Sequence, residues 1–183
     1  MSSSKFGLIF ALVAPQKSGK TRLIKHVLER FAVFKPVVTY TTRAWREPDD
    51  GIFYHTSVAH AELEAARIAG RTPEFIVYGE QIYATYQGEL DAALVEGHLI
   101  GAFTEEGVSQ LRQNGYKLVV VYVETIGAVH DRQDSARSAS ERLRVASSIE
   151  IQQTIVNDFT RADGFEKAAQ DLETFISSCI QVS

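Results

Sequence analysis

The apolar and polar positions of the chain alternate between two kinds of stretch. Residues 5–13 (KFGLIFALV) form a nearly continuous apolar run, which is typical of a parallel strand covered on both faces. Over residues 21–34 the apolar positions recur with helical spacing, so a helix is expected to follow directly. The same succession returns later, with helices predicted over 87–96 and 105–113 and strands over 98–103 and 117–123.

The hydrophobic patterns in the rest of the chain are less regular but still predict secondary structure. A β-branched and aromatic run predicts a strand over 36–42, which leads into a polar loop over 43–51. Spacing and alternation further predict a helix over 59–69, short strands over 75–86, a helix over 141–152, a short strand over 154–156 and a closing helix over 165–180. Residues 127–140 carry few apolar side chains and several charges, so we expect a mobile segment there.

The alternation of strands and helices predicts an α/β fold. Such a chain forms a central parallel sheet covered by helices on both faces, a three-layer α/β/α arrangement, and binds ligands at the carboxyl ends of the strands. We expect one domain over 1–183, with a core of about 1–36 and 87–183. The segment of about 37–86 is interpreted as a small insert beside the sheet.

Composition and charge narrow the function classes. The 183 residues, 45% apolar and 23% charged, suit one compact domain. A net charge of −4 gives no general attraction to nucleic acid or anionic lipid, so neither is an expected partner and any anion site must be local. Cys179 is the only cysteine and the five histidines show no zinc spacing. The first apolar run is too short to span a bilayer and makes a poor signal peptide, so the cytoplasm is expected.

A phosphate-binding loop is predicted between the first strand and the first helix. Residues 14–21 (APQKSGKT) match the second half of the P-loop pattern G-x-x-x-x-G-K-[ST], with Ala14 at the first glycine position and Lys17 in place of a small residue. Backbone N–H groups of such a loop surround phosphate, its lysine neutralises charge, and its hydroxyl reaches magnesium. The candidates for ATP are Gln16, Lys17, Ser18, Gly19, Lys20 and Thr21, with Thr21 as the Mg²⁺ ligand. The alternative is an ordinary strand-to-helix turn capped by Ser18.

The segment after this helix resembles the guanylate kinase family. Residues 37–46 (VVTYTTRAWR) look like the family's S-V-S-x-T-T-R-x-x-R element, and residues 50–55 (DGIFYH) follow like its D-G-x-x-Y-x-F. The resemblance covers nearly the full length, and it implies an acceptor-binding insert and a lid over about 127–141. By resemblance Arg43, Arg46 and Tyr54 grip the phosphate of an acceptor monophosphate, which suits guanidinium and phenol donors. The alternative is a solvated loop with Tyr54 as a packing residue.

Two further motifs add acceptor-site residues by resemblance. Residues 74–76 (EFI) are similar to the family's E-F-x-E-x-A, and residues 82–85 (IYAT) are similar to its x-Y-G-[TS]. These similarities imply that Tyr83 contacts the acceptor phosphate and that the Thr85 hydroxyl helps to hold the base. Thr39, within the first element, completes the expected acceptor site.

The donor side is implied by the end of the chain. Residues 155–158 match the family's I-V-N-D, which implies that Asn157 lies beside the donor adenine, although Asn-Asp after a strand is also common turn chemistry. Arginines also lie where the family has lid arginines, and surface helix residues are the alternative for each: Arg132, Arg137, Arg142 and Arg144. Arg142 fits best, and the expected catalytic residues are Lys20, Arg132 and Arg142.

The chain departs from the family at three carboxylate positions. Val77 occupies the place of the second glutamate of E-F-x-E, and Ala102 and Thr104 occupy the places of the D-x-D aspartates. The segment between Val77 and Tyr83 is also shorter than usual, so Glu74 or Glu80 is a substitute, although each is expected to be exposed. Magnesium would then rely on Thr21, nucleotide phosphates and water, with Glu105 or Glu106 as possible assistants.

The sequence therefore favours ATP- and Mg²⁺-dependent phosphoryl transfer to a nucleoside monophosphate, with GMP or dGMP as the first candidate. The missing carboxylates motivate an alternative, a catalytically degenerate module that binds a phosphorylated partner. The retained pair Lys20 and Thr21 argues against it, because such a module has no need of them. A different small phosphorylated acceptor is a further option, and the oligomeric state stays open.

Overall fold

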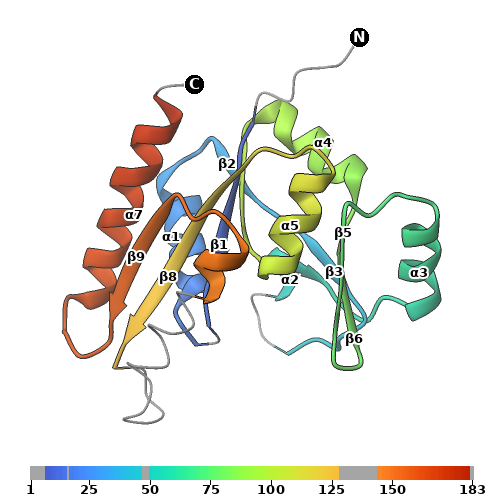
Figure 1. The fold of residues 1–183 in the computed structure, drawn as a ribbon, viewed down its shortest axis with the longest axis horizontal. Helices are drawn as coiled ribbons and strands as arrows, with labels where there is room; N and C mark the ends of the chain where they lie inside the picture. The colour runs from blue at the N-terminus through green and yellow to red at the C-terminus, as the bar shows by residue number, and fades with distance from the viewer. Residues whose placement is uncertain (1–6, 16, 47–49, 128–143, 182–183) are drawn as a thin grey trace.

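A five-stranded parallel sheet forms the centre of the computed structural model, which describes residues 7–15, 17–46, 50–127 and 144–181 (Figure 1). The strand order is β2-β7-β1-β8-β9, and every neighbouring pair is parallel. The strands are β1 (Ile9–Val13), β2 (Phe34–Pro36), β7 (His98–Ala102), β8 (Leu118–Ile126) and β9 (Gln153–Asp158). Strand β1 is buried throughout, as its apolar run predicts.

Helices cover both faces of this sheet. Alternate residues of β1 point to opposite faces, so Ile9 packs with α4 (Gln87–Glu96) and α5 (Glu105–Gln113). Phe10 instead packs with α1 (Lys20–Arg30) and α7 (Gly164–Ile180). The predicted three-layer α/β/α arrangement is confirmed. In the described part of the chain, no helix combines the length and apolar character that a membrane crossing requires.

A second, four-stranded sheet lies beside the first and has the order β4-β3-β6-β5 (Figure 1). Its strands are β3 (Thr39–Thr41), β4 (Tyr54–His55), β5 (Glu74–Tyr78) and β6 (Gln81–Thr85). The short α2 (Asp50–Phe53) and the helix α3 (His60–Ile68) accompany it. Strands β5 and β6 form an antiparallel hairpin whose turn contains Gly79 at a positive φ of 60°.

Most predicted elements are present, but the single strand predicted over 36–42 is wrong. The chain forms β2 at the edge of the first sheet and then β3 in the second, because Val37 N still donates to Ile100 O whereas Tyr40 pairs with Ala84 of β6. The helix α2 begins within the last two residues of the segment predicted as a loop and extends to Phe53. Of the helix predicted over 141–152, residues 144–148 are helical, and the predicted lid lies almost wholly outside the described residues.

Helix α5 connects the two sheets. The Gln110 side chain donates to Phe75 O and accepts from Phe75 N, at 3.1 and 2.7 Å, so it pairs with the outer edge of β5 as a further strand would. Asn114 Nδ2 donates to Pro73 O at 3.0 Å. These bonds hold the C-terminal half of α5 close to the start of β5, which matters for the site described next.

Candidate functional site

The loop between β1 and α1 has a backbone that tolerates few side chains. Gly19 has a φ of +85°, and a Cβ added there would lie 2.6 Å from Nδ2 of Asn157. The same Asn157 amide donates to Ser18 O at 2.9 Å. The end of β9 therefore braces the loop, and glycine is required at position 19 both for its φ and for this close approach.

Lys17 adopts a left-handed backbone conformation as well, with a φ of +60°. For a residue other than glycine this conformation costs about 1–3 kcal/mol and is found mainly at functional sites. Lys17 is exposed at the loop surface.

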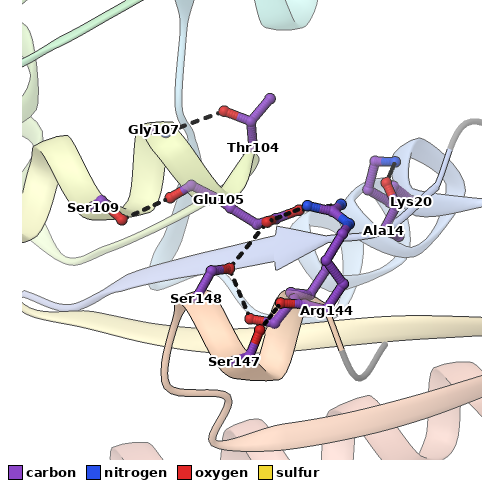
Figure 2. A network of polar contacts seen from close by, with 10 residues as sticks. Ala14, Lys20, Thr104, Glu105, Gly107, Ser109, Arg144, Ser147 and Ser148 are labelled. Atoms are coloured by element: carbon purple, nitrogen blue, oxygen red, sulfur yellow. Dashed lines mark hydrogen bonds and ion pairs between the residues drawn. The ribbon is translucent and has the colours of Figure 1, made fainter. Parts of the chain in front are cut away.

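The Lys20 side chain folds back over its own loop. Its ammonium group donates to Ala14 O at 2.7 Å and to Pro15 O at 2.8 Å, as Figure 2 shows for Ala14. The Lys20 ammonium group therefore lies against the loop backbone at the N-terminus of α1. A helix N-terminus with a nearby lysine attracts phosphate.

A cavity of about 440 Å³ adjoins the loop. Its lining is strongly cationic although the whole chain has a net charge of −4. The lining residues are Lys17, Ser18, Gly19, Lys20, Thr21, Arg22, Lys25 and Phe159. The volume lies within the range of small-molecule sites. The described lining thus places a cluster of cations beside the N-terminus of α1, which is the local feature that an anion site needs in an acidic chain.

Ser18 does not cap the helix, so that alternative is wrong. The cap position belongs to Gly19, which has no side-chain cap bond. The Ser18 side chain is 1% exposed, and among the described residues its Oγ has no hydrogen-bond partner. An unsatisfied buried hydroxyl in a cationic loop is consistent with a ligand site.

Thr21 connects the loop to the second sheet. A narrow cavity of about 20 Å³ is lined by Thr21, Thr39, Tyr54 and Ala102, together with Ile24, Val37, Phe53 and Gly101. The predicted Mg²⁺ ligand and two predicted acceptor residues thus meet at one point. In this structure the cavity has room for about one water molecule.

Arg43 is buried and ion-paired rather than part of a solvated loop. It is 7% exposed, and its two terminal nitrogens donate to the two Asp50 oxygens at 2.8 and 3.0 Å. These hydrogen bonds raise the pKa of Arg43 further, against the opposing effect of burial. Asp50 also accepts from Arg46 N at 2.7 Å. Asp50 thus organises the arginine segment; its place in the D-G element was the only signal of this in the sequence.

Tyr54 and Arg46 differ in exposure around this ion pair. The Arg43 Cζ atom lies 5.0 Å from the centre of the half-buried Tyr54 ring. Burial raises the pKa of Tyr54, and Arg43 opposes this effect, so the phenol keeps its proton at neutral pH. Arg46 is exposed, and Tyr83 is half-buried opposite Thr41 in the second sheet.

Glu74 is a buried carboxyl group that faces Thr85. The two residues are directly opposite one another in the hairpin and are 5% and 0% exposed. Glu74 Oε2 and Thr85 Oγ1 have no hydrogen-bond partner within the described ranges. Burial raises the pKa of Glu74 to about 8, with a smaller opposing effect from Thr85. The expectation that Glu74 is exposed is wrong.

The hairpin register and a glycine of α5 explain this burial. The turn pairs Tyr78 with Gln81, which places Glu74 rather than Val77 opposite Thr85. Glu74 Oε1 lies 2.5 Å from the position that a Cβ on Gly107 would take, so the absence of a side chain there makes room for the carboxyl group. Val77 is 62% exposed, and Glu80 is exposed as expected.

The end of β7 carries no free carboxylate toward the loop. Ala102 is exposed, and the Thr104 hydroxyl caps α5 by accepting from Gly107 N at 3.1 Å (Figure 2). Glu105 binds the Arg144 guanidinium through both oxygens, at 2.7 and 2.8 Å, and accepts from Ser148 Oγ. No group of three metal-binding side chains occurs in the described part of the chain.

The remaining predicted residues are divided between described and undescribed segments. Asn157 is 1% exposed and lies beneath the loop, where it holds Ser18. Arg144 is exposed and paired with Glu105. Gln16, Arg132, Arg137 and Arg142 lie outside the described residues. Phe159, which lines the cavity at the loop, was missed because an exposed aromatic residue after a strand carries no motif.

Comparison with known proteins agrees with this geometry. The family model described as guanylate kinase matches residues 8–179. The guanylate kinases of Methylobacillus flagellatus and Acinetobacter baylyi are 29% and 28% identical to the chain, over 94% of it and over 89% and 87% of their own lengths. A crystal structure of guanylate kinase from Anaplasma phagocytophilum has the same fold, with a TM-score of 0.68 at 16% identity, covering 94% of this chain and 86% of that one. The chain belongs to the guanylate kinase family.

Proposed function

We propose that this protein transfers the terminal phosphoryl group of ATP to a nucleoside monophosphate, with GMP or dGMP as the acceptor. One observation carries the proposal: the cationic phosphate loop meets the second sheet at Thr21, and that sheet contains a buried carboxyl group and hydroxyl, Glu74 and Thr85. A donor phosphate site therefore adjoins a site with the groups needed to recognise a base.

The donor triphosphate binds to the loop residues Gln16 to Thr21. In this proposal Lys20 exchanges its two carbonyl partners for phosphate oxygens, since a charged acceptor makes a stronger hydrogen bond than a carbonyl. The Thr21 hydroxyl suits magnesium, which commonly takes few protein ligands and completes its shell with nucleotide phosphates and water. When bound, the ion neutralises charge on the donor phosphates.

The acceptor phosphate binds beside Tyr54, which lines the narrow cavity and lies next to Arg43. Arg46 is the exposed guanidinium and is the direct phosphate ligand in this proposal, with Tyr54, Tyr83 and Thr39 as further donors. Arg43 stays bound to Asp50 and keeps positive charge beside Tyr54. A guanidinium suits this task because its donors match phosphate oxygens in pairs.

Glu74 and Thr85 recognise the base. Guanine presents its N1–H and N2–H donors side by side, and two carboxylate oxygens match that pair, whereas adenine has an acceptor at N1. The Thr85 hydroxyl donates to the guanine O6. This assignment restores a base-reading carboxylate to a chain whose Val77 had suggested its loss. The alternative of a degenerate module that binds a phosphorylated partner is not favoured.

Phosphoryl transfer then needs positioning and charge neutralisation. An acceptor phosphate oxygen attacks the γ-phosphorus, the bond to the β–γ bridging oxygen breaks, and ADP leaves. Lys20 stabilises the charge on the transferred group, and Arg132 and Arg142 are proposed to add theirs from the lid. Holding the two substrates in line supplies much of the acceleration.

A coupled assay of ADP formation tests the proposed function. With ATP and Mg²⁺ we expect turnover with GMP and dGMP and far less with AMP, CMP and UMP, because those bases do not present the N1–H and N2–H pair. Lys20→Ala should lower kcat/KM at least about 10²-fold, as expected when one charge-stabilising donor is lost. Lys167→Ala, which removes an exposed lysine of α7, is the control. Bound ATP without turnover of any acceptor would refute the proposal.

The two arginines of the acceptor site should respond differently to substitution. Arg46→Ala should raise the KM for GMP about 10- to 100-fold and leave stability unchanged, because it removes an exposed, charge-assisted donor. Arg43→Ala should raise the KM for GMP as well, and in addition it should lower the free energy of unfolding by about 3 kcal/mol, because Asp50 loses its buried ion-pair partner. Acceptor kinetics and urea unfolding measure both effects, with the exposed Arg71→Ala as control. Equal stability losses in both variants would contradict this division.

Glu74 should make both acceptor binding and stability depend on pH. The carboxyl must ionise to accept from guanine, so the KM for GMP should fall as pH rises from 6 towards 8. Stability should change in the opposite sense. The raised folded-state pKa favours the protonated form, so stability is full below the unfolded pKa and is lost up to about pH 8, at about 1.4 kcal/mol per pH unit.

Glu74→Gln isolates these effects because it is uncharged at every pH. The variant should bind GMP weakly, show little pH dependence of its KM and be more stable than wild type at pH 9. Glu80→Gln, an exposed position in the same hairpin, should behave as wild type. A Glu74→Gln variant with normal GMP kinetics would remove Glu74 from the acceptor site.

A further inference from the structure

Phe159 is an exposed aromatic residue beside the phosphate loop. It follows directly after β9, its side chain is 42% exposed, and its backbone N–H donates to Ile126 O at 2.9 Å. The ring Cζ lies 3.9 Å from the position that a Cβ on Gly19 would take. Phe159 belongs to none of the hydrophobic clusters found among the described residues. Packing of the core therefore does not account for an aromatic residue here.

The other residues around this cavity divide by chemistry. Residues 17–21 of the phosphate loop line one side of the cavity, and Arg22 and Lys25 are contributed by the first turns of α1. Phe159 is the one large apolar side chain in the described lining, and that lining contains no carboxylate or amide side chain. The cavity thus has a cationic part suited to phosphates and a single aromatic surface.

A nucleoside triphosphate matches the cationic and aromatic parts of this cavity in one orientation. Its phosphates take the N–H groups of the loop and of the α1 N-terminus, which leaves the ribose and base to extend over the rest of the 440 Å³ cavity. Arg22 does not compete for the Phe159 ring, since its guanidinium lies 3.5 Å from the centre of the Phe165 ring. The Phe159 ring therefore offers its surface to the base.

We propose that Phe159 is the platform on which the donor base stacks, and that the donor is recognised by stacking rather than by a hydrogen-bond pattern. This proposal rests on the proposed donor site and deepens it. Stacking accepts any base with a large aromatic face, so ATP and GTP should serve alike and pyrimidine triphosphates should bind less tightly. Acceptor selectivity, which belongs to Glu74 and Thr85, is a separate property.

Binding calorimetry with Mg²⁺ tests the platform without requiring turnover. The ligands are ATP, GTP, CTP and inorganic tripolyphosphate, and the variants are Phe159→Ala, Phe159→Trp and the control Val156→Ala. Val156 is an exposed apolar residue of the same strand that does not line the cavity. Stacking contributes about 1–3 kcal/mol per base, so Phe159→Ala should weaken ATP and GTP roughly 5- to 150-fold.

Tripolyphosphate separates the base from the phosphates. Its affinity should be the same in wild type and Phe159→Ala, and Phe159→Trp should bind ATP at least as tightly as wild type. Unchanged ATP affinity in Phe159→Ala, or an equal loss for tripolyphosphate, would overturn the platform and leave the proposed function standing. A wild-type preference for ATP over GTP of tenfold or more would overturn recognition by stacking alone. A wild type that binds no nucleoside triphosphate would defeat the proposed function as well.

Discussion

Strand β1 fixes the position of the groups that we assign to donor binding. It lies in the middle of the parallel sheet, pairs with β7 on one side and β8 on the other, and is buried along its length. Parallel strands end on the same side, so β1, β7 and β9 bring the phosphate loop, Ala102 and Asn157 to one edge. The contact between Asn157 and Gly19 then ties the loop to β9. A change that displaced β1 would therefore move the phosphate loop away from Asn157 and disrupt the donor site.

The acceptor side depends on a second constraint, the burial of Glu74 between the hairpin and α5. Burial disfavours the ionised form of a carboxyl group more than the protonated form, and a pKa of about 8 implies that Glu74 is mostly protonated near neutral pH. Gly107 makes room for it, and Gln110 holds α5 against the neighbouring Phe75. Among the described residues Glu74 Oε2 and Thr85 Oγ1 have no hydrogen-bond partner, and in our proposal a guanine base would satisfy both groups.

The sequence predicted the parts that depend on local pattern. The helices α4 and α5 have the predicted bounds, because periodicity, Gly97 and the Thr104 cap define them locally. The strand and helix on either side of the predicted phosphate loop are present for the same reason. The split between β2 and β3 was not predictable from the β-branched run alone, because two different sheets decide it. Motif alignment placed Val77 at the carboxylate position, whereas the hairpin register places Glu74 opposite Thr85. Burial of Arg43 likewise depends on Asp50, seven residues away.

Proton release on acceptor binding tests the role of Glu74 most directly. Calorimetric titration of GMP at pH 7 in two buffers with different ionisation enthalpies gives the number of protons exchanged, and Glu74→Gln measured in parallel removes the contribution of the GMP phosphate. Because the carboxyl group is mostly protonated in the empty site and must ionise to accept from guanine, the account predicts release of about one proton per GMP bound in wild type beyond that in the variant. Equal proton exchange in wild type and Glu74→Gln, with GMP bound to both, would contradict it.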